Sequence, residues 1–144
     1  MLGPKIVCPH LMLTPRFALD LVGRYVVTRS PFIYPLERYD EEVFLKIVCA
    51  ILNSSVTQWY ISMHAYKYRG GYNRVEVPLL RSLPTPDPAA VAPAALNRVL
   101  ALVDQAIREG PTRELEAEID NTVMGMYDLS ERERSEMTGA WNDT

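Results

Sequence analysis

Short apolar and β-branched runs dominate the first 35 residues of the chain. Lys5-Ile6-Val7-Cys8 predicts a strand, which Pro9 ends or confines to a sheet edge. Further short strands are predicted over residues 16–20, 25–28 and 31–34, with Gly23 as the turn residue of a hairpin between the first two. This part of the chain is therefore expected to form a small sheet.

The period of the apolar pattern changes at residue 40. Apolar residues recur at helical spacing over 43–52, behind the acidic run Asp40-Glu41-Glu42, which suits a helix N-terminus. Asn53-Ser54-Ser55 breaks this helix and caps a second one, predicted over 56–65. The expected apolar contacts of the second helix are Trp59, Tyr60 and Met63. After a polar loop, residues 75–77 and 79–83 are predicted to return to the sheet.

Helical spacing also marks the last third of the chain. Prolines interleaved with alanines form a stiff linker, and two amphipathic helices follow it. Their apolar stripes are Leu96, Val99, Leu100, Val103 and Ile107, then Leu115, Ile119, Val123 and Met126. Gly110-Pro111-Thr112 is a tight connection that favours an antiparallel pair. A last short helix begins at Ser130, which has capping-box spacing to Glu133.

The predicted fold class is α+β: a small mixed sheet with packed helices, followed by an antiparallel helical pair. We expect residues 1–88 to form the α/β domain and residues 89–144 to form a Pro/Ala linker and helical tail. The tail helices either fold back on the first part or pair with another protein.

Composition places the chain among ordinary globular proteins, since 48% of its residues are apolar and 23% are charged. No apolar run approaches the ~20 residues that span a bilayer, so no membrane association is expected. The N-terminus lacks the layout of a secretion signal, which makes the cytoplasm the expected location. Cys8 and Cys49 lie in apolar stretches and are expected to be buried free thiols.

Charge is distributed unevenly along the chain, although the net charge is only −3. Residues 1–90 carry ten Lys/Arg against seven Asp/Glu, a net +3, whereas residues 91–144 carry five against eleven, a net −6. A surface that touches phosphate is therefore expected in the first part.

The stretch from Tyr66 to Arg74 is the most informative part of the sequence. It interleaves three tyrosines with Lys67, Arg69 and Arg74, and Arg81 would join these cations if it folds back beside them. Gly70-Gly71 permits positive φ and close approach of the backbone to a phosphate. An arginine guanidinium can donate two hydrogen bonds at once to a phosphate or to the edge of a guanine. The alternative is a solvated basic hairpin that merely joins a helix to a strand.

Other chemistries are weakly indicated. His10 and His64 lack metal-ligand spacing to a Cys, Asp or Glu, so no metal site is predicted. A small nuclease would need dispersed carboxylates such as Asp40, Glu42 and Glu76 to assemble. No triad arrangement, dinucleotide-binding glycine motif or Walker lysine motif is present, so no catalytic residue is assigned.

An ordered set of short motifs resembles a known family. Lys5-Ile6-Val7 followed by Pro9-His10, and Pro15 to Asp20, resemble the first strands of the TaqI-like C-terminal specificity domain of adenine-N6 DNA methyltransferases and of restriction enzymes fused to them. Ile51-Leu52-Asn53-Ser54 is similar to the family's "LLNS" pattern, and Leu83-Pro84-Thr85-Pro86 to its "LPIP" exit strand. Lys67 to Tyr72 also resembles that family.

The resemblance implies a mixed α/β module that recognises a short site in double-stranded DNA and docks on a methyltransferase catalytic domain or subunit. The methyltransferase N-P-P-[YF] motif and the glycine motif that binds S-adenosylmethionine are absent, so that cofactor is expected only on a separate catalytic domain. The resemblance points to Lys67, Arg69 and Arg74 as DNA-facing residues. Tyr68 and Tyr72 are their expected stacking or phosphate-bonding partners, and the second-rank candidates are Arg16, Arg24 and Arg29.

Two other functions compete with DNA recognition. The helices of 94–127 would make the chain a protein-interaction module if they dock on a methyltransferase or on a second copy. A small enzyme is the third hypothesis, and the missing motif spacing counts against it. From an isolated recognition module we expect weak, salt-sensitive binding of DNA.

Overall fold

The computed structural model describes residues 3–8, 11–12, 16–23, 32–33, 40–86 and 90–142. Along the chain, the strands are β1 (Lys5–Val7), β2 (Leu11–Met12), β3 (Ala18–Asp20), β4 (Phe32–Ile33), β5 (Tyr66–Lys67) and β6 (Asn73–Arg74). The helices are α1 (Glu41–Leu52), α2 (Ser55–His64), the 3-10 turn η1 (Arg69–Gly71), α3 (Val77–Arg81), α4 (Pro93–Glu109), α5 (Arg113–Met124) and α6 (Glu131–Asn142). The fold is α+β, as the sequence predicts.

Two small antiparallel sheets make up the β part. The first has the order β3-β1-β4, with Ile6 opposite both Leu19 and Ile33. The second has the order β2-β6-β5, with Asn73 opposite both Met12 and Lys67. Because β1 and β2 are close in sequence but belong to different sheets, the chain passes from one sheet to the other directly after Cys8.

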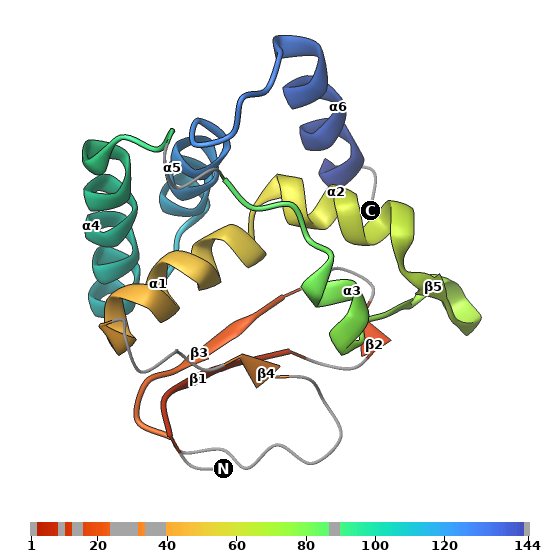
Figure 1. Ribbon diagram of the computed structural model, residues 1–144, viewed down its shortest axis with the longest axis horizontal. Coiled ribbons are helices and arrows are strands. Elements are labelled where there is room, and N and C mark those ends of the chain that lie inside the picture. The colour runs from red at the N-terminus through yellow and green to blue at the C-terminus, as the bar shows by residue number, and fades with distance from the viewer. Residues whose placement is uncertain are drawn as a thin grey trace.

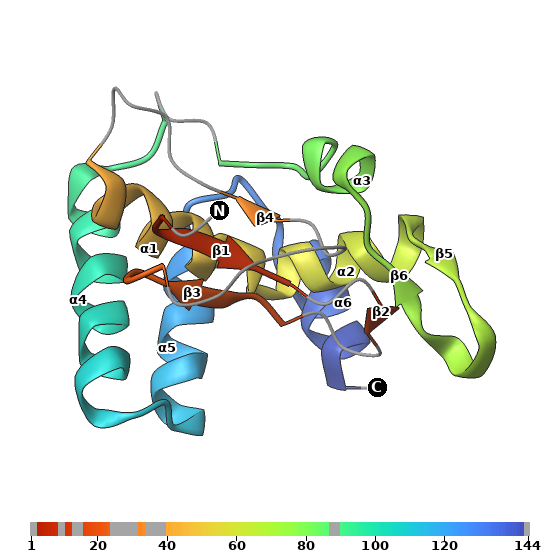
Figure 2. The ribbon, with the colours of Figure 1, turned by 90° about the horizontal axis from the view of Figure 1, so that it is seen from below.

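The helices α1 and α2 form a central layer (Figures 1 and 2). On one side α1 packs against β1 and β3, and on the other it packs against α4 and α5. The helix α2 contacts α5 and α6. The sequence leaves open whether the tail helices fold back on the first part of the chain or pair with another protein. The contacts with α1 and α2 show that they fold back. The helices α4 and α5 lie side by side as the predicted antiparallel pair.

Apolar burial follows these layers. Ile6, Phe17 and Leu45 form a core with their neighbours between the β3-β1-β4 sheet and α1. Val99 and Val123, both fully buried, pack with Ala50 between the tail and α1. A third cluster, Val56, Met124 and Met137, joins α2 to α5 and α6. Most residues of the predicted stripes of α4 and α5 pack in the second of these cores, whereas Ile107 is exposed.

The break between α1 and α2 has a clear physical cause. Asn53 ends α1, and its side-chain amide bonds both backbone groups of Phe17: Oδ1 accepts from the amide N at 2.9 Å, and Nδ2 donates to the carbonyl at 3.0 Å. Ser54 then caps α2, with its Oγ accepting from the amide of Thr57. At the other end of α1, Asp40 is the N-cap and accepts from the amide of Val43, in keeping with the predicted acidic helix start.

Polar contacts attach the tail to this junction. Asp120 of α5 accepts from the amide N of Ser55 at 2.8 Å and from its hydroxyl at 2.5 Å. Lys46 of α1 pairs with Asp104 of α4 at 2.6 Å, and this hydrogen bond raises the pKa of the lysine. The carboxylate of Asp120 thus accepts hydrogen bonds at the first turn of α2, where backbone N–H groups have no partner within the helix. The helix dipole also favours a negative charge there.

A buried ion pair lies within the first sheet. Lys5 and Asp20 are directly opposite each other on β1 and β3, and both are buried. The ammonium of Lys5 lies 2.7 Å from the Asp20 carboxylate and also donates to the carbonyl of Gly3 at 3.3 Å. Because an unpaired charge at this depth is very costly, each residue depends on its partner.

Two predictions about local structure are wrong. Residues 75–77 and 79–83 do not return to the sheet, because Val77–Arg81 forms α3 and residues 82–86 contain no strand. Pro78 explains the difference: it lies in the first turn of α3, where its missing N–H costs nothing, whereas in a strand it would remove a ladder hydrogen bond. Met63 is expected from the sequence to be an apolar contact of α2, but it is 65% exposed.

Other predictions fall outside the described residues. These are the strand over 25–28, His10, and Pro88 of the linker. Among the described residues, no helix is long and apolar enough to cross a membrane.

The contact between Asp120 and Ser55 predicts a measurable loss of stability. Asp120→Ala removes a charged acceptor from two donors, so we expect it to lower the free energy of unfolding by about 2 kcal/mol. Asp120→Asn, which keeps one acceptor, should lose less. Urea unfolding followed by circular dichroism at pH 7 measures both. Asp128→Ala, at an exposed position, is the control and should change stability by less than about 0.5 kcal/mol; an equal effect of the two alanine substitutions would contradict the assigned role.

Candidate nucleic-acid interface

The strands β5 and β6 with η1 form a hairpin that projects from the body of the protein beyond the C-terminal end of α2 (Figures 1 and 2). Tyr66 pairs with Arg74, and Lys67 pairs with Asn73. The strand β2 covers only the far edge of β6, so β5 is an edge strand. The predicted basic loop is therefore an ordered ribbon with one open edge and an exposed tip.

Two consecutive glycines shape the tip. Gly70 and Gly71 both have a φ of 80°, a conformation that side chains with a Cβ adopt at a cost. The backbone amide of Tyr68 donates to the carbonyl of Tyr72 at 2.7 Å, and the amide of Gly71 donates to the carbonyl of Tyr68 at 3.1 Å. The ring of Tyr72 lies against Gly70, since a Cβ there would be 3.3 Å from the ring. Glycine therefore suits the positive φ of both positions, and at Gly70 it also leaves room for the Tyr72 ring.

The three predicted cations of the hairpin differ in how they are held. Lys67 donates to the side-chain carbonyl of Asn73, which is itself buried. The Arg74 guanidinium pairs with Glu76, with 2.9 Å between Nε and Oε1. Arg69, at the tip, is exposed and makes no ion pair or hydrogen bond with any described residue. Two cations are therefore oriented in advance along the ribbon, and the third is free to reach a ligand.

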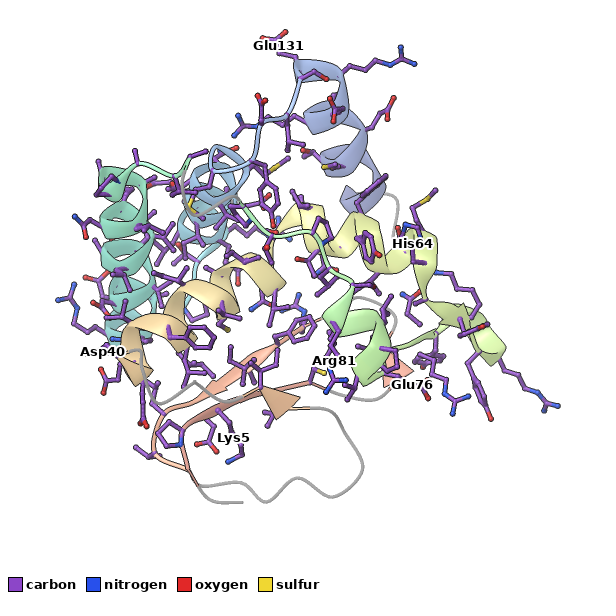
Figure 3. The ribbon with its side chains drawn as sticks, in the orientation of Figure 1. Lys5, Asp40, His64, Glu76, Arg81 and Glu131 are labelled. Atoms are coloured by element: carbon purple, nitrogen blue, oxygen red, sulfur yellow. The ribbon has the colours of Figure 1, made fainter. Side chains whose placement is uncertain are left out.

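Contacts between α2 and the segment after α3 support the base of the hairpin. The Tyr60 hydroxyl and the Ser82 hydroxyl are 3.0 Å apart, and the Tyr60 ring stacks on His64 with 4.2 Å between ring centroids. Arg81 ends α3 on the same side of the molecule as Glu76 (Figure 3). It is exposed and has no partner among the described residues, so it is a free cation near the hairpin.

The second-rank arginines are not part of this hairpin. Arg16 is exposed and lies two residues before β3, a strand of the sheet that does not contain the hairpin. The register of β1 with β3 puts it at the end of that sheet from which the chain crosses to β2. Arg24 and Arg29 lie outside the described residues.

The carboxylates that a nuclease would need do not come together. Asp40 and Glu76 lie at opposite ends of the molecule (Figure 3). Asp40 caps α1, Glu42 pairs with Lys46 at 3.5 Å, and Glu76 pairs with Arg74. Across the described ranges, no three His, Cys, Asp or Glu side chains are grouped as metal ligands would be.

Neither cysteine has the environment of a catalytic nucleophile. Both are free thiols; Cys8 is buried and Cys49 is half-buried. Burial raises the pKa of Cys8 to about 12 and that of Cys49 to about 11, the latter opposed by a hydrogen bond from Asn53. Both thiols therefore stay protonated near neutral pH and are poor nucleophiles.

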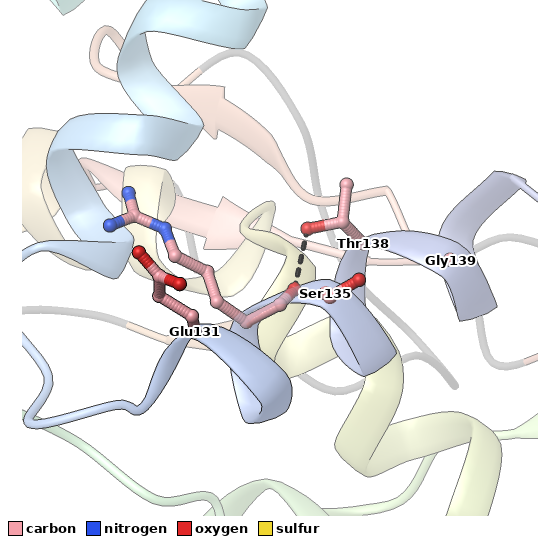
Figure 4. Close-up of a pocket in the computed structure, with 5 residues that line it drawn as sticks. Glu131, Ser135, Thr138 and Gly139 are labelled. Carbon is pink, nitrogen blue, oxygen red and sulfur yellow. Dashed lines mark hydrogen bonds between the residues drawn. The ribbon is translucent and has the colours of Figure 1, made fainter.

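A shallow hollow lies along one side of α6 (Figure 4). Its lining residues all come from that helix: Glu131, Arg134, Ser135, Thr138 and Gly139. The guanidinium of Arg134 donates to the carbonyl of Asn121 at 3.0 Å, and the hydroxyl of Thr138 donates to the carbonyl of Arg134 at 2.7 Å. The hollow is lined by surface side chains of a single helix, which gives it no converging set of functional groups.

The structure adds two residues to the candidate interface, since Asn73 and Glu76 hold the two oriented cations. Tyr66, one of the three tyrosines that the sequence indicates, is 80% exposed. No local pattern indicates the role of Asn73, because it follows from pairing across the hairpin.

Comparison with known proteins bears on this same part of the chain. The family model of the TaqI-like C-terminal specificity domain matches residues 3–85. The match spans both sheets, α1, α2, the hairpin and α3, and ends before the tail helices. No curated protein matches the chain.

The glycine conformation at the tip predicts a local effect of substitution. Gly71→Ala meets no neighbouring atom, but at a φ of 80° it costs about 1–2 kcal/mol. We expect exchange of the Tyr68 amide hydrogen, measured by NMR, to become roughly tenfold faster while the core amides are unaffected. Gly71→Asn should have a smaller effect, because asparagine tolerates this conformation better. Unchanged Tyr68 exchange in the alanine variant would show that the turn does not depend on the glycine.

Proposed function

Because this chain belongs to the TaqI-like C-terminal specificity domain family, whose members are DNA-recognition modules of methyltransferases, we propose that it selects a specific sequence in double-stranded DNA for an adenine-N6 methyltransferase or a restriction-modification enzyme. It is non-catalytic by itself. Methyl transfer, with its S-adenosylmethionine, takes place on a separate catalytic domain or subunit, since the sequence contains neither the catalytic motif nor the cofactor glycine motif.

The projecting hairpin is the observation that carries this proposal. The tip of the hairpin, residues 68–72, lies beyond the pairing of β2 with β6, and there the hairpin is only two chain segments wide. A two-stranded ribbon is narrow enough to enter the major groove of B-DNA, where each base pair presents a distinct pattern of donors and acceptors. This ribbon has Lys67 and Arg74 along its strands and Arg69 at its tip, all of them exposed. The hairpin therefore carries positive charge, which the DNA phosphates attract, on a tip that fits the major groove.

The three cations divide into two roles. Lys67 and Arg74 are oriented by Asn73 and Glu76, so they suit contacts to phosphates at defined positions. Arg69 has no partner among the described residues and extends from the tip, so it suits bidentate contact with a guanine edge. Tyr68 and Tyr72 flank the tip and supply rings and hydroxyl groups. Arg16, Arg24 and Arg29 are proposed as secondary contacts to the DNA backbone.

The proposal also covers how the chain is organised. Residues 1–88 are the recognition domain, since the family match ends at residue 85, and residues 89–144 are the linker and helical tail. The tail supports the recognition domain through α1 and α2, from which the hairpin projects. The free thiols agree with a reducing compartment, so we place this activity in the cytoplasm.

Binding of duplex DNA tests the proposed function. With fluorescence anisotropy on a mixed-sequence duplex, we expect weak binding that falls steeply as salt rises from about 50 to 200 mM. Arg69→Ala combined with Arg74→Ala should weaken binding about tenfold or more, because one base contact and one phosphate contact are lost. The slope of log affinity against log salt should fall by about one, since only Arg74 is assigned to a phosphate.

The matched control removes the same charge elsewhere. Arg108 and Arg113 are exposed on α4 and α5, so the double alanine variant at these positions should bind DNA within about twofold of the unaltered protein. Equal losses in the two double variants would mean that net charge, and not the hairpin, governs binding. An absence of DNA binding by the unaltered chain would overturn the proposed function.

Docking through the helices of 94–127 is the alternative, either on a methyltransferase or on a second copy. The stripe residues Val99 and Val123 pack on α1 of the same chain, which leaves Ile107, at 54% exposure, as the apolar residue of the stripe that faces outward. We therefore expect size-exclusion chromatography with light scattering to give the monomer mass of 16.3 kDa over a range of concentrations. A dimer that Ile107→Glu dissociates would favour the alternative.

A further inference from the structure

The register of the hairpin places its aromatic side chains on one face. In an antiparallel ribbon, directly paired residues share a face, and successive pairs alternate between faces. Tyr66 pairs with Arg74, and Lys67 pairs with Asn73. The hydrogen bond from the amide of Tyr68 to the carbonyl of Tyr72 extends the same register by one pair. One face therefore carries three tyrosines and Arg74, and the other carries Lys67 and Asn73.

We call Tyr66, Tyr68, Tyr72 and Arg74 the tyrosine face. Its rings are unusually accessible: Tyr66 is 80% exposed, Tyr68 is 56% exposed and Tyr72 is 41% exposed. A contiguous group of exposed large side chains marks an interaction site more often than a solvated surface. Because β5 is the open edge of its sheet, no further strand among the described residues flanks the tyrosines on that side.

The geometry points to unpaired DNA bases as the occupant of the tyrosine face, an inference that rests on the proposed function and extends it. Positions two apart on a strand are about 6.8 Å apart, twice the stacking distance of aromatic rings, so a base fits between the side chains of Tyr66 and Tyr68. Every base offers a flat face, and stacking on aromatic side chains does not depend on sequence. Arg74, at the edge of the same face, is placed to neutralise the phosphate of the stacked nucleotide.

Unpaired bases arise from the proposed function itself. An enzyme that methylates a base in duplex DNA must first take that base out of the stack, which leaves unpaired nucleotides in a distorted duplex. The cations Lys67, Arg69 and Arg74 serve any DNA, whereas the three tyrosine rings of the tyrosine face serve only DNA with exposed ring surfaces. The hairpin is thus proposed to hold the opened duplex as well as to locate the site.

A comparison of paired and opened DNA tests this inference on the full chain. The probes are a fluorescently labelled 24-base-pair duplex and the same duplex with a three-nucleotide unpaired bubble, measured by anisotropy at about 50 mM salt. We expect the bubble to bind at least about tenfold more tightly. Tyr66→Ala and Tyr68→Ala should each weaken binding to the bubble by about tenfold and binding to the paired duplex by less than about twofold, because only the bubble offers a base to stack.

Three conservative variants separate stacking from other roles. Tyr66→Phe and Tyr68→Phe keep a flat ring and should keep the preference for the bubble. Tyr68→Leu keeps apolar area without a ring and should behave like the alanine variant. Lys67→Ala, on the opposite face, should weaken binding to both DNAs by the same factor. All three positions are exposed, so thermal unfolding should be unchanged. An alanine variant of Tyr66 or Tyr68 that unfolds early is replaced in the comparison by the leucine variant at the same position, which also lacks a ring.

Each remaining outcome decides the matter. Equal affinity of the unaltered chain for both DNAs, or a preference that survives Tyr68→Leu, overturns the stacking role and leaves duplex recognition intact. An absence of binding to either DNA overturns the proposed function and the stacking role together.

Discussion

Three consecutive polar residues hold the parts of this protein together. The side-chain amide of Asn53 bonds both backbone groups of Phe17, Ser54 begins α2, and Ser55 receives the carboxylate of Asp120 from the tail. The first sheet, the two central helices and α5 therefore meet within one turn of chain. A change in the direction of α2 at this point would move the hairpin at its far end, so the orientation of the candidate interface depends on this junction.

Much of the helical part was predictable from the apolar period. The helix after Asp40, the break at Asn53 and the two tail helices are all observed, because a 3.6-residue period with caps at its ends has few alternative interpretations. The segment after the hairpin was predicted wrongly as strands. Its leucines have no clear period over so few residues, and the decisive signal was Pro78, which a helix tolerates in its first turn.

The candidate interface was predictable in its composition and not in its geometry. The cations, tyrosines and glycines of 66–74 are local features, so the sequence identifies the segment. Which side chains share a face follows from the register of β5 with β6, and that register depends on hydrogen bonds across the turn. The buried pair of Lys5 and Asp20 was missed for the same reason, since a charge on a short strand is normally expected to face solvent.

The positions of the hairpin and of the acidic tail also affect how the molecule diffuses. The helices α4 and α5 lie at the opposite end of the fold from the hairpin. Residues 93–124, which span them, carry three arginines against six carboxylates, a net −3, whereas residues 66–74 of the hairpin carry a net +3. These two regions therefore form an electric dipole with its positive pole at the hairpin. Near a polyanion such a dipole experiences a torque that turns the hairpin forward before contact, so productive encounters are favoured although the molecule as a whole is repelled.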